Sequence, residues 1–220
     1  NRMLFGMERP NDGEQKAERE LTAAHEAGHA LLTALLLPES QIRRVSIIPT
    51  GKGAAGYSMA IPPEKLFHRR QELLHHMAVA LAGREAEALY LGGYEQISNG
   101  ASNDIERATS TIRRMITEWG MSDELGTITF GNNNGDQVFL GRDLGRDRNY
   151  SEAVAYSIDK EVKRMMDECH AEARRLLSEN LDKLTLVAET LKDREVIQAN
   201  EFLALMEGRS LDELDKQKEE

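Results

Sequence analysis

Hydrophobic residues recur at helical spacing along most of this chain, with polar residues between them. The pattern predicts four long helices and two shorter ones, over residues 16–36, 64–91, 103–119, 151–179, 181–192 and 198–206. Two short apolar runs, 44–49 and 56–61, flank a Thr-Gly-Lys-Gly turn and predict a strand–turn–strand unit. A second strand pair, 127–130 with 137–140, is predicted across an asparagine-rich turn. We therefore expect a mostly α fold with a small β hairpin.

Composition narrows the classes of protein that this chain can represent. Its 220 residues carry a net charge of −10, which argues against a nucleic-acid-binding protein, because such proteins need a basic surface. The single cysteine excludes an intramolecular disulfide, and the longest apolar stretch, residues 27–37, is too short to span a membrane. We expect one domain over residues 16–207, with a linker over 1–15 and a charged tail over 208–220.

The strongest chemical signal is His25-Glu26-Ala27-Gly28-His29, within the first predicted helix. Residues four positions apart lie on one helix face, so both imidazoles can bind one zinc ion while the glutamate reaches the water position. Both histidines lie on the apolar stripe of the helix, where two imidazoles are hard to satisfy without a cation. The motif predicts His25 and His29 as ligands of Zn²⁺ and Glu26 as the catalytic base. Gly28, which costs a helix about 1 kcal/mol relative to alanine, predicts a close approach at that surface.

A catalytic zinc site takes a third protein ligand, and two carboxylates are candidates. Asn103 and Glu106 are expected to cap the third long helix, which would place Asp104 in its first turn, pointing toward the core. Glu87 lies near the apolar stripe of the preceding helix, but Arg84 offers it an ion pair from three residues away. We therefore prefer Asp104 as the third ligand.

These residues resemble the peptidase domain of FtsH-type ATP-dependent zinc metalloproteases. The resemblance covers about residues 18–207 and rests on the histidine motif and on three further runs, Leu81-Ala82-Gly83-Arg84-Glu85-Ala86-Glu87, Gly100-Ala101-Ser102-Asn103-Asp104-Ile105-Glu106-Arg107-Ala108-Thr109 and Glu118-Trp119-Gly120-Met121-Ser122. It implies a largely helical fold, zinc ligation by His25, His29 and Asp104, and Glu26 as catalytic base. We expect the small sheet to lie beside this active site.

In such proteins the peptidase domain follows an AAA+ ATPase module, which uses ATP and Mg²⁺ and is itself preceded by membrane-spanning helices. Six subunits form a ring. The resemblance implies that residues 1–15 link this domain to such a module. It also implies a membrane-anchored protein that carries this domain on the cytoplasmic or organelle-interior side. Residues 52–60 depart from the family pattern, because small residues stand where such proteins carry a bulkier run.

The expected function is hydrolysis of internal bonds in unfolded polypeptide delivered by the ATPase module. The strand over 56–61, ended by two prolines, is expected to present a free edge near the zinc and to pair with the substrate backbone. One alternative is an aminopeptidase with Glu87 as third ligand, although no acidic cluster near the motif would hold a free amino terminus. The other is a non-catalytic zinc-stabilised assembly scaffold. The presence of Glu26 argues against a scaffold, because structural zinc sites need no base.

Overall fold

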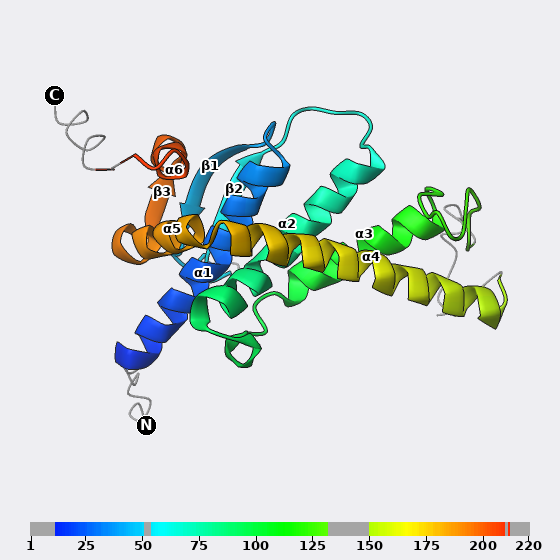
Figure 1. Cartoon of the computed structure of the whole chain (residues 1–220), viewed down its shortest axis with the longest axis horizontal. Helices are drawn as coiled ribbons and strands as arrows, with labels where there is room; N and C mark the ends of the chain where they lie inside the picture. Colours follow the sequence, from blue (N-terminus) through cyan, green and yellow to red (C-terminus); the bar gives the residue numbers. More distant parts are fainter. Residues whose placement is uncertain (1–11, 51–53, 132–149, 210, 212–220) are drawn as a thin grey trace, which may run out of the picture.

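The computed structural model describes residues 12–50, 54–131, 150–209 and 211, and it confirms the mostly α fold (Figure 1). The described elements are α1 (Asp12–Leu36), β1 (Gln41–Ser46), β2 (Tyr57–Ile61), α2 (Arg70–Leu91), the 3-10 turn η1 (Tyr94–Gln96), α3 (Ser102–Thr117), α4 (Glu152–Glu179), α5 (Leu181–Arg194), β3 (Val196–Gln198) and α6 (Ala199–Met206). None of the described helices combines the length and the apolar character that crossing a bilayer requires.

The start of α2 differs from the prediction by six residues. The helix begins at Arg70 rather than at residue 64, after a stretch without regular structure. Within this stretch the Nζ atom of Lys65 lies 2.6 Å from Glu39 and 3.1 Å from Glu72 of α2. These ion pairs tie the stretch to the segment before β1, and helical periodicity in the sequence does not record such tertiary contacts.

Of the second predicted strand pair, the first strand is wrong. Residues 127–130 form no strand. The backbone amide of Phe130 instead donates to the carbonyl oxygen of Thr117, the last residue of α3, at 2.8 Å. The run therefore satisfies a free helix-end carbonyl rather than a ladder. Residues 137–140 lie outside the described residues.

The sheet has the strand order β2-β1-β3, with both pairings antiparallel. The predicted hairpin is confirmed as a pairing, with Val45 opposite Ser58, but β1 covers residues 41–46 rather than 44–49. β3 is absent from the sequence-based prediction, because three residues give too little alternation to detect. It pairs with β1 through Val45 and Ile197, both fully buried. β2 is consequently an edge strand of the described sheet.

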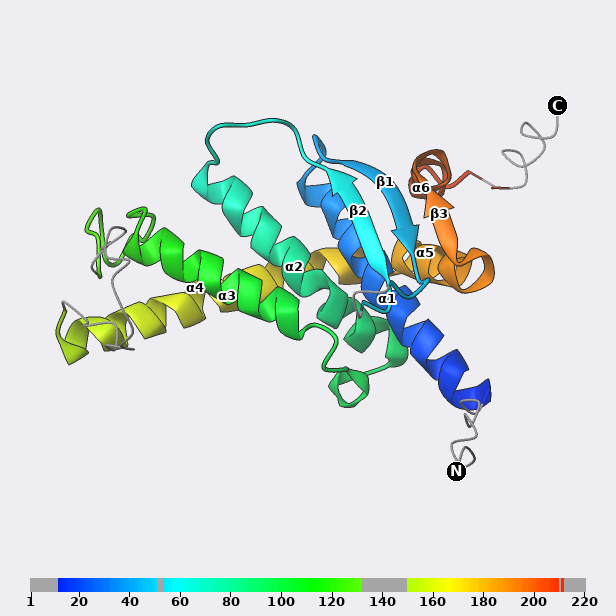
Figure 2. The same ribbon diagram turned by 180° about the vertical axis from the view of Figure 1, so that it is seen from behind.

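Helix α1 lies at the centre of the molecule, where it packs against α2, α5 and the sheet (Figures 1 and 2). The fully buried Ala23, Ala27 and Ala30 let neighbouring elements come close to it. A β-carbon at Gly28 would lie 2.6 Å from the carbonyl oxygen of Ala82 in α2. The close approach expected at Gly28 is therefore that of α2, which runs beside the histidine motif.

Candidate metal centre

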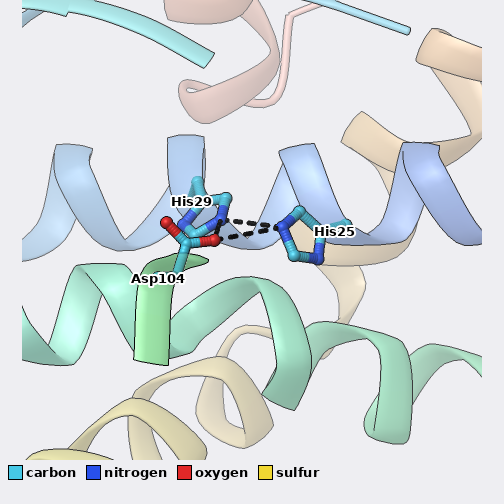
Figure 3. Close-up of side chains that lie close together, drawn as sticks. All are labelled: His25, His29 and Asp104. Carbon is cyan, nitrogen blue, oxygen red and sulfur yellow. Dashed lines mark hydrogen bonds and ion pairs between the residues drawn. The ribbon is translucent and has the colours of Figure 1, made fainter. Parts of the chain in front are cut away.

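Three side chains from two helices converge beside the middle of α1 (Figure 3). The Nε2 atoms of His25 and His29 lie 3.0 Å apart. The Oδ2 atom of Asp104, which comes from α3, lies 3.6 Å from Nε2 of His25 and 3.4 Å from Nε2 of His29. The structure thus brings together the three residues that the sequence singles out as metal ligands.

The other ring nitrogens decide which atoms of the histidines face the centre. The Nδ1 atom of His25 lies 2.7 Å from Oε1 of Glu87, and Nδ1 of His29 lies 2.8 Å from the carbonyl oxygen of Val79. Both partners accept hydrogen bonds, so a neutral ring carries its proton on Nδ1 and leaves the Nε2 lone pair free. When both rings are neutral, two imidazole lone pairs and a carboxylate oxygen face one another with no hydrogen atom between them. This donor set fits a zinc ion, which would satisfy all three.

The charges at the centre shift its acidities. Burial alone would lower the pKa of His25, but hydrogen bonds with Asp104 and Glu87 raise it to about 9. Burial alone would raise the pKa of Asp104, but the two histidines hold it well below its usual range. The carboxyl group of Asp104 is therefore ionised near neutral pH, and the cluster favours a cation, either a proton or a metal ion.

Gly83 of α2 makes room for the two histidine rings. A β-carbon at this position would lie 2.6 Å from the Nε2 atoms of both His25 and His29. Sequence reasoning assigns Gly83 no role of its own. The signal that marks it is a glycine in a helix interior, where it costs about 1 kcal/mol relative to alanine and usually has a packing or functional reason.

Glu87 lies behind His25 and not among the converging atoms. Its side chain is fully buried. Its Oε1 atom contacts Nδ1 of His25, and its Oε2 atom accepts a hydrogen bond from the backbone amide of Ser98 at 2.7 Å. The expected ion pair between Glu87 and Arg84 is wrong, because within the described residues the carboxylate turns toward α1 instead. Burial alone would raise the pKa of Glu87, but the bond with His25 lowers it, so this carboxylate is ionised and orients the ring.

Asp104 lies in the first turn of α3, as predicted, but the start of that helix differs. The helix begins at Ser102 and its N-cap is Ala101, which makes no side-chain hydrogen bond. The predicted cap by Asn103 and Glu106 is therefore wrong. The first-turn position still places the carboxylate of Asp104 where the helix dipole favours a negative charge.

Glu26 lies on the wall of the cleft that contains the two histidines and is 7% exposed. Burial raises the pKa of its carboxyl group, while the positive charges of His29 and His25 oppose this rise. Gly56, just before β2, packs against it: a β-carbon there would lie 2.9 Å from Cγ of Glu26 and 2.7 Å from the carbonyl oxygen of Ser46. Because Gly56 has no side chain, the backbone just before β2 can pack closely against β1 and α1 beside Glu26.

The cleft has a volume of about 820 Å³ and opens over the converging side chains. Tyr57 and Ser58 of the edge strand β2 line it together with Asn103 and Arg107 of α3. The expected edge strand is therefore present, and it borders the cleft. An extended chain lying in the cleft would run beside β2, which pairs with β1 alone among the described strands.

The cysteine contributes no nucleophile. Cys169 is buried in α4, and burial raises the pKa of its thiol to about 12. Its neighbour His170 points elsewhere, with Nε2 at 2.5 Å from Oε1 of the buried Glu85. A thiol must be deprotonated to attack a carbonyl, so cysteine catalysis is not available from this pair.

A His-Glu-x-x-His helix whose histidines meet a carboxylate from a second helix is the arrangement expected of a metallopeptidase. Comparison with known proteins agrees with this class. The profile described as Peptidase family M41 matches residues 14–205. The chain therefore belongs to Peptidase family M41, which confirms the resemblance seen in the sequence.

Relatives with curated names are similar over nearly all of this chain. It is 44% identical over 212 residues to "ATP-dependent zinc metalloprotease FtsH 1" of Thermoanaerobacter sp. (strain X514), covering 96% of this chain and 34% of that protein. It is 40% identical over 214 residues to "ATP-dependent zinc metalloprotease FtsH" of Bacillus subtilis (strain 168), covering 97% and 33%. The chain thus spans about a third of the length of these relatives.

Proposed function

We propose that this chain is a zinc metalloendopeptidase domain in which His25, His29 and Asp104 bind the ion and Glu26 is the general base. The observation that carries the proposal is the convergence of three ligand atoms, from two helices, within 4.8 Å of one another. Family membership and the names of the relatives support the same reaction. When bound, zinc would polarise the scissile carbonyl and acidify a water molecule.

The residues of this chain supply orientation and proton transfer. Glu87 and the Val79 carbonyl hold the two imidazoles in the tautomer that exposes Nε2. The carboxylate of Glu26 accepts a proton from the attacking water and delivers it to the leaving amine. Its burial supports this role, because a raised pKa brings a carboxylate closer to the range in which it can both accept and release a proton.

The substrate that the cleft supports is an extended polypeptide. β2 borders the cleft as an edge strand, and main-chain pairing with such an edge binds a peptide without reading its side chains. A protease that must accept many sequences needs this kind of recognition. We therefore propose unfolded polypeptide as the substrate and cleavage at internal bonds.

The whole protein is proposed to be larger than this domain. The names of the relatives include ATP dependence, and the chain spans about a third of their length. We propose that residues 16–207 form the peptidase domain, that 1–15 link it to an ATPase module using ATP and Mg²⁺, and that 208–220 form a charged tail. A homo-hexamer anchored in a membrane through other segments, with this domain on the cytoplasmic or organelle-interior side, follows from the resemblance.

The two alternatives are less well supported by the geometry. An aminopeptidase with Glu87 as zinc ligand would require this carboxylate to turn away from Nδ1 of His25 and the Ser98 amide, both of which it contacts at 2.7 Å. A non-catalytic scaffold would leave unexplained a buried Glu26 on the wall of an open cleft beside the histidines.

Zinc analysis combined with casein hydrolysis tests the proposed function. We expect the purified chain to hold tightly bound zinc, to lose casein cleavage on chelation and to regain it when zinc is restored. The products should be internal fragments, as mass spectrometry would show. Release of single amino acids would favour the aminopeptidase, and zinc binding without cleavage would favour the scaffold. A His25→Gln/His29→Gln variant, which lacks both imidazole ligands, is the matched control.

A further inference from the structure

We propose that His68, Glu72 and His76 form a second site, which binds a divalent transition-metal ion on the wall of the same cleft. The ligand atoms of these three residues lie within 4.8 Å of one another. They belong to one continuous segment, the end of the loop before α2 and the first two turns of that helix. The centre described above instead joins residues from two helices.

The side chains of this second cluster share one face. Glu72 and His76 are four residues apart in α2, a spacing that places side chains one above the other. His68 precedes the helix, and its Nδ1 atom lies 3.2 Å from Oε1 of Glu72. The rings of His68 and His76 are nearly perpendicular, at 89°, with centroids 6.2 Å apart. A tetrahedral ion bonded to both rings at the usual zinc–nitrogen length would place the centroids about 5.2 Å apart, so the two rings would close by about 1 Å on binding it.

The chemistry of the donors indicates the class of ion. Two imidazoles and one carboxylate suit Zn²⁺, Cu²⁺ or Ni²⁺, whereas Mg²⁺ and Ca²⁺ prefer oxygen ligands alone. Each histidine offers the ion one ring nitrogen, and Glu72 offers one carboxylate oxygen.

A lysine already contacts the carboxylate of this cluster. Nζ of Lys65 lies 3.1 Å from Oε1 of Glu72 and 2.6 Å from Oε2 of Glu39. A metal ion bound to Glu72 would displace Lys65 from that carboxylate and leave the contact with Glu39 in place. Removing Lys65 should consequently strengthen metal binding, whereas the same change would only weaken a cluster with a purely structural role.

The location of this second site would place its ion next to a peptide bound in the cleft. His68 and His76 line this cleft together with His25 and Glu26. A cation bound there would lie on the wall of the same cavity as the first centre, as a site separate from it in sequence and in ligands. Zinc uptake alone can therefore distinguish the two sites, without any measurement of cleavage.

Equilibrium dialysis against Zn²⁺, followed by metal analysis, tests this proposal. We expect the wild-type chain to bind two equivalents and the His68→Gln/His76→Gln variant to bind one. The His25→Gln/His29→Gln variant should retain the second equivalent. His75→Gln is the matched control: this neighbouring histidine contacts the carbonyl oxygen of Leu36 and lies outside the cluster, so its variant should bind two equivalents.

A Lys65→Gln variant adds a directional test. We expect it to reach half-saturation of the second equivalent at a lower zinc concentration than the wild type. Three results would overturn the proposal: a wild-type chain that binds one equivalent at saturating zinc, a His68→Gln/His76→Gln variant that still binds two, or weaker second-site binding after Lys65→Gln. Retention of the first equivalent in the His68→Gln/His76→Gln variant shows that this variant is folded.

Discussion

Gly83 of α2 faces the imidazole of His25 so closely that a β-carbon on the glycine would lie 2.6 Å from its Nε2 atom. The same β-carbon would lie 2.6 Å from Nε2 of His29. A side chain at this position of α2 would thus occupy the space next to both Nε2 atoms. Gly28 has the complementary role, because its missing side chain lets the α2 backbone approach α1.

The Gly83→Ala substitution should weaken zinc binding by about 10- to 100-fold, the range typical of changes around metal ligands. The added methyl group displaces imidazole rings at the ends of flexible side chains, so the metal-free fold should change little in stability: helix propensity gains up to about 1 kcal/mol, while the hydrogen bonds to Glu87 and the Val79 carbonyl weaken. Zinc competition with a chelator and chemical denaturation would measure the two effects. Gly28→Ala is the control: its methyl group meets backbone atoms that cannot move aside, so it should lower the free energy of unfolding. Unchanged zinc affinity in Gly83→Ala would contradict this role.

Glu26→Gln should abolish cleavage while leaving zinc content unchanged. An amide cannot accept the proton of water, and general-base catalysis contributes about 10²- to 10⁴-fold to rate. Peptide cleavage and metal analysis on the same preparation would test this. A variant that keeps more than about a hundredth of the wild-type rate would remove Glu26 from the role of base.

Asp104→Ala should lose zinc, whereas Glu87→Ala should only weaken zinc affinity, by about 10- to 100-fold. Asp104 supplies one of the converging atoms, whereas Glu87 acts through Nδ1 of His25. Chelator competition would rank the two variants. The assignment fails if the ranking is reversed, or if anomalous scattering places a Glu87 oxygen at about 2.0–2.2 Å from the metal.

Ester substitution in the substrate tests pairing with β2. Replacing a single non-scissile amide by an ester removes one backbone N–H and keeps the side chains. If the peptide pairs with the edge of β2, particular replacements should raise KM by several-fold, about 0.5–1.5 kcal/mol for each lost hydrogen bond. Matched all-amide peptides serve as controls. Equal KM values at every position would exclude main-chain pairing as the source of affinity.

His170→Gln should lower stability at about pH 6 more than at about pH 9.5. The bond to Glu85 raises the pKa of His170 above its unfolded value of 6.5, so its contribution is full below that pH and is lost as pH rises through the raised pKa. Because the side chain is 40% exposed, we expect an effect of only about 1 kcal/mol at the lower pH. Denaturation at both pH values would measure it.

Arg175→Gln provides the control for this pH effect. Arg175 pairs with Glu172 and Glu179 on the surface of the same helix, and its charge does not change between the two pH values. Its stability effect should therefore be the same at both. An equal effect of His170→Gln at both pH values would contradict the charged pair with Glu85.

The sequence by itself predicted the helical class and the β1–β2 hairpin and singled out His25, Glu26 and His29 as candidate site residues, because these features are local. Helical periodicity, turn residues and an i, i+4 spacing act over a few residues. Asp104 could also be singled out from the sequence, since nearby residues predict its place in the first turn and on the inward face of a helix.

The tertiary structure decided what depends on residues far apart in the chain. The partner of Glu87 is His25 rather than the nearby Arg84, and the roles of Gly83 and Gly28 follow from the packing of α1 on α2. β3 and the late start of α2 likewise depend on pairing with distant segments. A contact between distant residues leaves no periodic trace in either segment, so only the folded chain shows which glycine makes room and which carboxylate orients a ring.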